Sequence, residues 1–158
     1  MAYPGTASTV TPLAPVTHGL KPVPDPDDLL TRPFWAAAAE ERLVLQRCSG
    51  CAAYHHPPVG VCPDCLSDDL AFEPVDGRGR VYSFVVVRDQ RLPAFDSLVP
   101  YLVASVALDA APHVTLATNL PGTGIDEVRI GMPVEVEFEE IAPGVRIPQF
   151  HATDEVTR

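Results

Sequence analysis

The sequence predicts a mainly β protein, in which an N-terminal helix and a rubredoxin-like zinc ribbon precede a small OB-fold barrel. Two observations lead to this prediction. All four cysteines fall into two Cys-x-x-Cys pairs, Cys48 with Cys51 and Cys62 with Cys65. After the second pair, short segments rich in β-branched and aromatic residues alternate with Gly- and Pro-containing turns, which is typical of a small Greek-key barrel of OB-fold size. We therefore expect residues 1–28 to form a tail, residues 29–70 the helix and ribbon, and residues 71–151 the barrel.

The tail, residues 1–28, is rich in Pro, Thr and Ala. Proline removes a backbone donor and fixes φ, so an extended and weakly ordered segment is expected. A free tail and a tail that lies on a partner subunit are both compatible with this composition.

A helix is expected next, from Asp28 or Thr31 to Arg42, because apolar residues recur at helical spacing within a segment of high helix propensity. Thr31 can cap its N-terminus. Phe34 and Trp35 are adjacent and cannot face the same groove. We therefore expect Phe34 to pack in the core, whereas Trp35 is equally suited to the core and to contact with a partner.

The cysteine spacing predicts a structural Zn²⁺ site, with Cys48, Cys51, Cys62 and Cys65 as the ligands. Tetrahedral zinc takes soft ligands at about 2.3 Å, and one Cys-x-x-Cys turn supplies half of them. Iron in a metal-swapped preparation, or thiols that are free or disulfide-bonded, are the alternatives. The neighbouring histidines, His55 and His56, are not needed as ligands, and a hydrogen bond to a thiolate is the role open to them.

The strands are predicted from period-2 alternation and from continuous apolar runs. The run Arg80–Arg88 is apolar on both faces, so we expect its outer face to be covered. Glu135, Glu137 and Glu139 alternate with apolar residues and are expected to form a solvated strand face rather than a catalytic site. The expected strands are Leu43–Arg47, Tyr54–His56, Ala71–Val75, Arg80–Arg88, Tyr101–Asp109, Val114–Leu120, Val134–Glu139 and Val145–Phe150.

The charge balance disfavours nucleic acid as a partner. The formal net charge is -10, from 11 basic and 21 acidic residues, whereas nucleic-acid affinity depends on phosphate neutralisation. A single-stranded nucleic-acid binder remains the alternative function, since OB-folds and zinc ribbons both serve that purpose. No apolar run reaches the roughly 18 residues of a membrane helix. The first ten residues show no secretory pattern, so we expect a cytoplasmic protein, in which paired cysteines favour metal over disulfide.

An ordered set of motifs between residues 30 and 150 resembles the zinc-ribbon/OB-fold proteins grouped as domain-of-unknown-function family thirty-five. These proteins are accessory subunits found with thiolase-superfamily proteins, including lipid-transfer-type aldolases, and with MaoC-like acyl-CoA hydratases. The motifs that carry the resemblance are Pro33-Phe34-Trp35, Leu45-Gln46-Arg47-Cys48-Ser49-Gly50-Cys51, Pro57-Pro58, Cys62-Pro63-Asp64-Cys65, Gly77-Arg78-Gly79-Arg80-Val81-Tyr82-Ser83-Phe84 and Ile130-Gly131-Met132-Pro133-Val134-Glu135-Val136.

The resemblance implies an accessory, non-catalytic subunit of a hetero-oligomer that processes acyl-CoA. The implied partner is a thiolase-like aldolase that cleaves a steroid-type side-chain acyl-CoA by retro-aldol chemistry, and the acyl-CoA itself is a further candidate contact. A zinc enzyme is disfavoured, because four thiolates leave no open position on the metal. The candidate residues for contact with partner or substrate, each equally compatible with an ordinary surface or satellite-core role, are Trp35, Tyr82, Arg88, Arg91 and Phe95.

Overall fold

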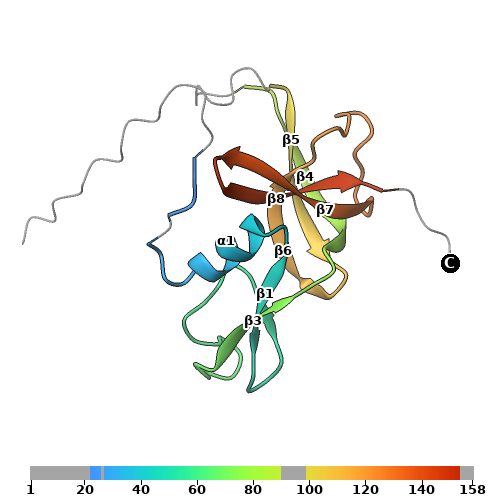
Figure 1. Ribbon diagram of the computed structural model, residues 1–158. Helices are drawn as coiled ribbons and strands as arrows, with labels where there is room; N and C mark the ends of the chain where they lie inside the picture. The colour runs from blue at the N-terminus through green and yellow to red at the C-terminus, as the bar shows by residue number, and fades with distance from the viewer. Residues whose placement is uncertain (1–21, 26, 90–98, 154–158) are drawn as a thin grey trace, which may run out of the picture.

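The computed structural model describes residues 22–25, 27–89 and 99–153 (Figure 1). Their strands form a three-stranded sheet in the order β2-β1-β3 and a five-stranded sheet in the order β6-β5-β4-β7-β8. The mainly β prediction is confirmed, and every predicted strand is present with small shifts in its ends. In chain order the elements are α1 (Arg32–Ala39), β1 (Val44–Cys48), β2 (Tyr54–His55), β3 (Leu70–Pro74), β4 (Arg78–Val87), β5 (Tyr101–Leu108), β6 (Ala111–Asn119), β7 (Pro133–Ala142) and β8 (Val145–Ala152).

Helix α1 is shorter than the sequence predicts, because it ends at Ala39 and not at Arg42. Glu41 adopts the left-handed conformation, with φ 58, and the chain leaves the helix through Schellman-type hydrogen bonds. The prediction that Thr31 caps the helix is also wrong, since its side chain makes no cap bond. Its hydroxyl instead donates to Asp28 Oδ2 at 2.6 Å.

No helix in the described residues is long and apolar enough to cross a membrane.

One hydrophobic core joins the helix, the ribbon and the barrel. Phe34 on α1 is only 3% exposed, as predicted, and it packs in the same cluster as Leu45 of β1 and Phe150 of β8. The adjacent Trp35 is half-buried and meets Phe34 edge to face, with ring centroids 4.8 Å apart. The strand that carries Cys48 is therefore packed into the barrel core, so the ribbon cannot rearrange without disturbing the barrel.

The five-stranded sheet curls until its two edge strands, β6 and β8, approach each other, and a buried side chain bridges them. Gln149 on β8 is 2% exposed. Its Oε1 accepts hydrogen bonds from the backbone N–H of Asn119 at 2.8 Å and from the hydroxyl of Thr118 at 3.0 Å. Its Nε2 donates to Glu139 at 2.8 Å. The barrel is thus completed at this point by a side-chain amide in place of a backbone ladder.

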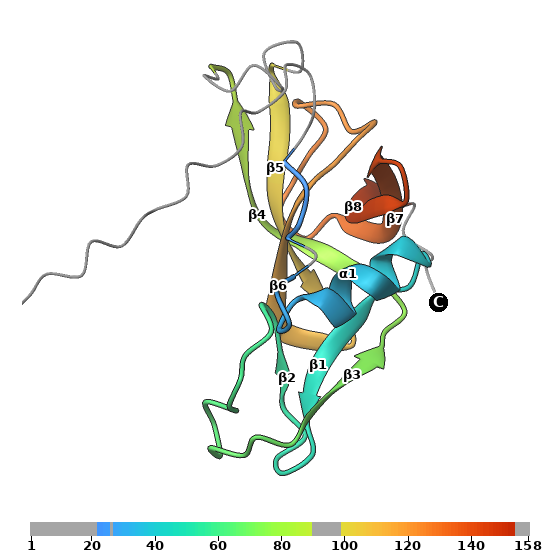
Figure 2. The same ribbon diagram turned by 60° about the vertical axis from the view of Figure 1, so that its left-hand side comes forward.

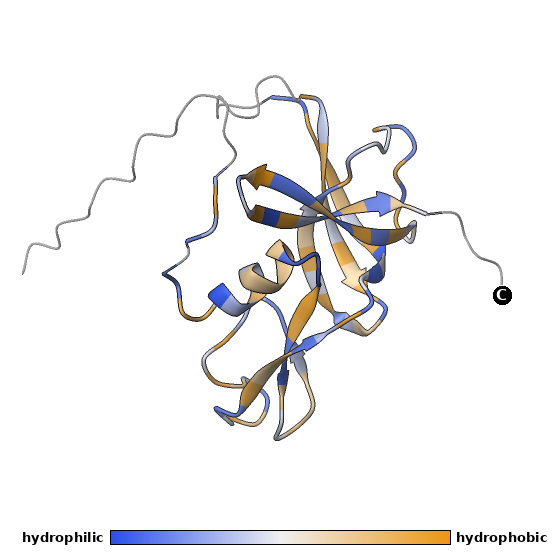
Figure 3. Cartoon of the chain, in the orientation of Figure 1, coloured by the Kyte–Doolittle hydropathy of each residue, from blue (hydrophilic) through white to orange (hydrophobic). Residues whose placement is uncertain are grey.

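The glutamate row on β7 has the structural role that its spacing predicts. Glu135 and Glu137 are exposed, and Glu139 is half-buried against Gln149. Figure 3 shows the corresponding alternation of hydrophilic and hydrophobic residues along the β7–β8 hairpin. The row is a solvated strand face with one member that holds the bridging amide.

Two side chains of the barrel hydrogen-bond to the helix and ribbon. Arg146 on β8 donates from Nη1 to the carbonyl of Ala39, at the end of α1, at 2.8 Å. His113 on β6 lies with Nε2 3.2 Å from the carbonyl oxygen of Tyr54 in β2. These contacts, together with the shared core, fix the helix and ribbon against the barrel.

The outer face of β4 departs from the sequence prediction. Tyr82 is 65% exposed and Val85 is 59% exposed, so in the described part of the chain the expected cover is absent. The register with β5 shifts between Val81 and Ser83. β4 pairs with β7 only at residues 78–80, whereas it pairs with β5 as far as Val87. Beyond Arg80, β4 therefore has a ladder partner on the β5 side alone among the described residues, and its other edge is open. The end of β4 extends with β5 away from the rest of the sheet (Figure 2).

Candidate metal centre

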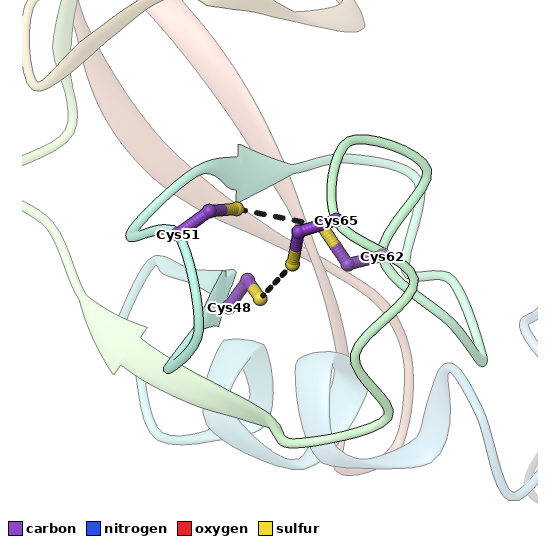
Figure 4. A group of neighbouring side chains, drawn as sticks. All are labelled: Cys48, Cys51, Cys62 and Cys65. Atoms are coloured by element: carbon purple, nitrogen blue, oxygen red, sulfur yellow. Dashed lines mark hydrogen bonds between the residues drawn. The ribbon is translucent and has the colours of Figure 1, made fainter.

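The two cysteine turns have the same backbone structure. In the first, the N–H of Ala52 donates to the carbonyl of Cys48 at 2.8 Å, and in the second the N–H of Leu66 donates to the carbonyl of Cys62 at 2.9 Å. Ala52 and Leu66 both take left-handed conformations, with φ 63 and φ 62. Each turn brings its two thiols to one side, and the turns face each other (Figure 4).

The four thiols form a cluster of the size that zinc requires. The Sγ atoms of Cys48 and Cys65 are 3.5 Å apart, and those of Cys51 and Cys62 are 3.6 Å apart. All four sulfurs lie within 4.8 Å of one another. Tetrahedral zinc with Zn–S bonds of about 2.3 Å places its sulfurs about 3.8 Å apart. A disulfide would need about 2.05 Å, so the cluster fits a metal ion and the cysteines are free thiols.

His55 lies beside this cluster and Asp64 lies within the second turn. His55 Nε2 is 3.4 Å from Cys62 Sγ, so the predicted contact between a histidine and a ligand sulfur is confirmed for His55. His56 instead packs on Phe34, with ring centroids 5.1 Å apart. A second possible set of metal ligands consists of His55, Cys62 and Asp64, whose ligand atoms also lie within 4.8 Å of one another. It shares Cys62 with the four-thiol cluster, so the two sets compete for one metal ion.

Replacing His55 by Phe is expected to weaken zinc binding about tenfold, because contacts to ligand atoms typically contribute 10–100-fold to metal affinity. Competition with a chromophoric chelator measures the change. His151→Phe is the matched control, since His151 lies on β8 beside Glu137 and outside the cluster. Equal zinc affinities for the two variants would show that the His55 contact is incidental.

The environment shifts the pKa values of the cluster thiols in opposite directions. Burial opposes ionisation of Cys48, but hydrogen bonds from the N–H of Cys51, from the Cys65 thiol and from the N–H of Gly50 lower its pKa to about 7. The N–H of Ser67 favours the Cys65 thiolate, but hydrogen bonding to the thiol of Cys48 and desolvation raise the pKa of Cys65 to about 12. One thiol of the metal-free cluster therefore ionises readily, whereas another holds its proton until a metal displaces it.

The pKa of Cys51 is also raised above its ordinary value of 9.0: the N–H of Ala53 lowers it, but desolvation and the Cys62 thiol outweigh that effect. Between pH 7 and 9, zinc must therefore displace protons from Cys51 and Cys65, and below pH 7 also from Cys48. Each thiol proton that zinc displaces contributes a factor of ten per pH unit, so we expect zinc affinity to fall at least about a hundredfold per pH unit from pH 9 to 7, and more steeply below pH 7. Chelator competition at each pH measures this, and a change below tenfold per unit would contradict it.

A buried amide that the sequence analysis did not identify positions the chain between the two turns. Gln46 on β1 is 4% exposed, and its Oε1 accepts a hydrogen bond from the N–H of Val59 at 2.7 Å. β1 pairs with β2 through Gln46 and His55. The same strand therefore carries Cys48, holds the loop that leads to Cys62 and pairs with the strand of His55.

The candidate contact residues do not gather at one place. Trp35 lines a pocket of about 340 Å³ between α1, the loop after β2, and the strands β6 and β8; neither Tyr82 nor Arg88 lines it. Tyr82 is on the exposed face of β4, and Arg88 is exposed just after that strand. Arg91 and Phe95 lie outside the described residues.

The helix, the four-cysteine ribbon and the curled five-stranded sheet together define a zinc-ribbon/OB-fold protein. Residues 35–71 match the family model for the "ChsH2, rubredoxin-like zinc ribbon domain", and residues 72–139 match that for the "ChsH2, C-terminal OB-fold domain". The chain belongs to the ChsH2 family, within the group known as DUF35. The cysteine cluster is accordingly the metal site of a zinc ribbon.

Two curated relatives are similar over most of this chain. The "Probable enoyl-CoA hydratase alpha subunit" of Thermomonospora curvata is 42% identical over 118 residues, which are 74% of this chain and 36% of that protein. The "3-oxo-4,17-pregnadiene-20-carboxyl-CoA hydratase alpha subunit" of Mycobacterium tuberculosis is 31% identical over 121 residues, 72% of this chain and 37% of that protein. The chain thus spans little more than a third of the length of these relatives.

Two solved structures share the fold. One, described as "Ltp2-ChsH2(DUF35) aldolase", has a TM-score of 0.73 and 36% sequence identity, and the match covers 84% of this chain and 98% of that chain. The other, a DUF35 protein of unknown function from Sulfolobus solfataricus, has a TM-score of 0.56 and 13% identity, over 80% of this chain and 87% of that chain. The second likeness concerns the fold alone.

Proposed function

We propose that this protein is an accessory, non-catalytic subunit of a hetero-oligomer that processes acyl-CoA, and that its partner is a thiolase-superfamily aldolase. The likeness to almost the whole of a chain described as "Ltp2-ChsH2(DUF35) aldolase" is the main support. The metal centre also supports an accessory role, since four thiols fill the coordination shell and leave no position for a substrate or a reactive water.

For the substrate, we propose an acyl-CoA with a steroid-type side chain that the partner cleaves by a retro-aldol step. The names of both curated relatives include a CoA thioester, and one of them names a pregnadiene carboxyl-CoA. In a retro-aldol step a β-hydroxyacyl-CoA splits between its α and β carbons, and a carbonyl product leaves with a shorter acyl-CoA. The accessory subunit stabilises the partner that carries out this step.

The test combines this chain with a purified thiolase-like aldolase and a β-hydroxyacyl-CoA, and follows the products by mass spectrometry. We expect cleavage by the mixture, little or none by the partner alone and none by this chain alone. Cleavage by this chain alone would contradict the non-catalytic assignment. If the partner alone cleaved the substrate as fast as the mixture does, the accessory role would be contradicted.

We further propose that the exposed apolar face of β4 contacts the partner. Tyr82 and Val85 leave more than half of their surface exposed on the part of β4 whose outer edge is open, and exposed aromatic residues on an open strand are common at interfaces. Replacing both residues by Ser is expected to weaken association at least about thirtyfold, the loss typical of a hot-spot aromatic (about 2 kcal/mol). Leu29→Ser is the control, since Leu29 is 72% exposed and lies on the segment before α1. If the double variant and the control variant bound the partner with equal affinity, the interface would lie away from β4.

The ion pairs in the described residues argue against the alternative, a single-stranded nucleic-acid binder. Four arginines each pair with a carboxylate: Arg42, Arg47, Arg78 and Arg146. The carboxylates offset the positive charges that would otherwise attract the phosphates of a nucleic acid. We expect no binding in a fluorescence titration with single-stranded DNA at low salt. Micromolar, salt-sensitive binding would favour the alternative.

A further inference from the structure

The pocket beside Trp35 lies at the junction of the three parts of the fold and is not part of the metal centre. It is bounded by Phe34 and Trp35 of α1, by His56 and Pro57 after β2, and by Ile147 of β8. Its volume of about 340 Å³ falls at the small end of the range of about 300–1,000 Å³ for small-molecule sites. A compound of one or two rings would fill it.

The walls of this pocket are held by contacts on several sides. The rings of Phe34 and Trp35 meet edge to face, and Phe34 also packs on His56. The end of α1 is tied to β8 by the hydrogen bond from Arg146 to Ala39. The pocket is therefore largely formed before any ligand enters, which reduces the ordering cost of binding.

None of the described residues that line the pocket is charged, although Asp, Glu, Lys and Arg make up 20% of the chain. A carboxylate or phosphate that entered it would lose water without gaining an opposite charge, which is costly. The lining therefore discriminates against the phosphates of CoA and against free acids, and favours neutral ligands.

One polar ring in the lining has hydrogen-bonding capacity that the described residues do not use. The half-buried His56 makes ring contact with Phe34 and has no hydrogen-bond partner among the described residues. Burial lowers its pKa, so at neutral pH the imidazole carries one donor nitrogen and one acceptor nitrogen. A ketone or hydroxyl oxygen on a ligand can pair with it.

We propose that this pocket binds a neutral, mainly apolar ring compound that carries one ketone or hydroxyl oxygen, with His56 as its hydrogen-bond partner. The site belongs to this chain alone and does not depend on the identity of the partner protein. The proposed ligand carries no charge, whereas an intact acyl-CoA carries the charges of its phosphates.

The zinc-loaded chain can be titrated with 1-decalone, a neutral bicyclic ketone, and with decalin-2-carboxylate, a charged compound of similar shape. Trp35 lines the pocket and is the single tryptophan of the sequence, so its emission reports on occupancy. We expect a saturable shift to shorter wavelength with the ketone, because water leaves the indole, and at least tenfold weaker binding of the carboxylate. No saturable response to the ketone, or equal affinity for both compounds, would overturn the proposal.

Two variants with the same chemical change locate the binding. Ile147→Phe adds bulk at the half-buried wall, whereas Ile130→Phe adds it at an exposed position that does not line the pocket. We expect Ile147→Phe to bind the ketone at least tenfold more weakly and Ile130→Phe to bind it as the wild type does. Equal binding by the two variants would overturn the proposal.

His56→Phe keeps a ring against Phe34 and removes the hydrogen bond. A loss of about fivefold to tenfold in ketone affinity is expected for one such bond, with zinc content unchanged. Unaltered affinity would remove His56 from the proposal, and an unfolded variant would leave the two isoleucine variants to decide it.

Discussion

Replacing Cys62 by Ser is expected to abolish tight zinc binding and to unfold the ribbon. Cys62 is fully buried, and its sulfur contacts both Cys51 and His55. Structural zinc supplies much of the folding free energy of a small module, and β1, the strand that ends at Cys48, packs Val44 and Leu45 into the same core as the barrel. We expect the free energy of unfolding to fall by at least about 4 kcal/mol. Elemental analysis and thermal unfolding measure the two losses.

Asp64→Asn is the control for this prediction, because Asp64 belongs only to the competing group with His55 and Cys62. We expect this variant to keep one zinc and nearly all of its stability. Loss of zinc from Asp64→Asn would favour the competing ligand set. A Cys62→Ser protein that is zinc-free, folded and competent for assembly would show that the metal has no structural role.

Replacing Gly79 by Ala is expected to destabilise the barrel by about 2–3 kcal/mol, as overpacking of a well-packed site does. A Cβ at Gly79 would lie 2.4 Å from the carbonyl oxygen of Ala107 and 2.9 Å from Cγ1 of Val106. Gly79 pairs with Leu108 on β5 and with Val134 on β7. The clash is with backbone, so β4 and β5 must separate where three strands meet.

Gly60→Ala provides the comparison for Gly79→Ala, because a Cβ at Gly60 meets no atom within 4 Å. Chemical denaturation should give Gly60→Ala a stability close to that of the wild type. If Gly79→Ala were as stable as Gly60→Ala, the close approach of β4 and β5 would not be a constraint on this fold.

Much of the architecture can be predicted from the sequence because its signals are local. The metal ligands lie within two short turns whose spacing fixes their geometry, and alternation along β7 shows which face is buried. The sequence misplaces the end of the helix because Glu41 adopts a left-handed conformation, which a single sequence suggests only when glycine or asparagine occupies the position.

The contacts that join distant segments could not be predicted in this way. Gln46 and Gln149 are buried amides, whereas polar residues are expected on the surface unless their partners are known. Arg146 and Ala39 lie 107 positions apart, so nothing local links them. The open face of β4 was missed because an apolar run on both faces of a strand does not show what lies against it.

The most direct test of the account is whether this chain assembles with a thiolase-like aldolase. The two proteins are co-expressed, purified through a tag on one of them, and analysed by size-exclusion chromatography with light scattering at low salt. We predict a single hetero-oligomeric species that contains this chain with its zinc bound, and that Cys62→Ser prevents its formation. If the folded, zinc-bound chain elutes alone beside a folded partner, the proposal of an accessory subunit is contradicted.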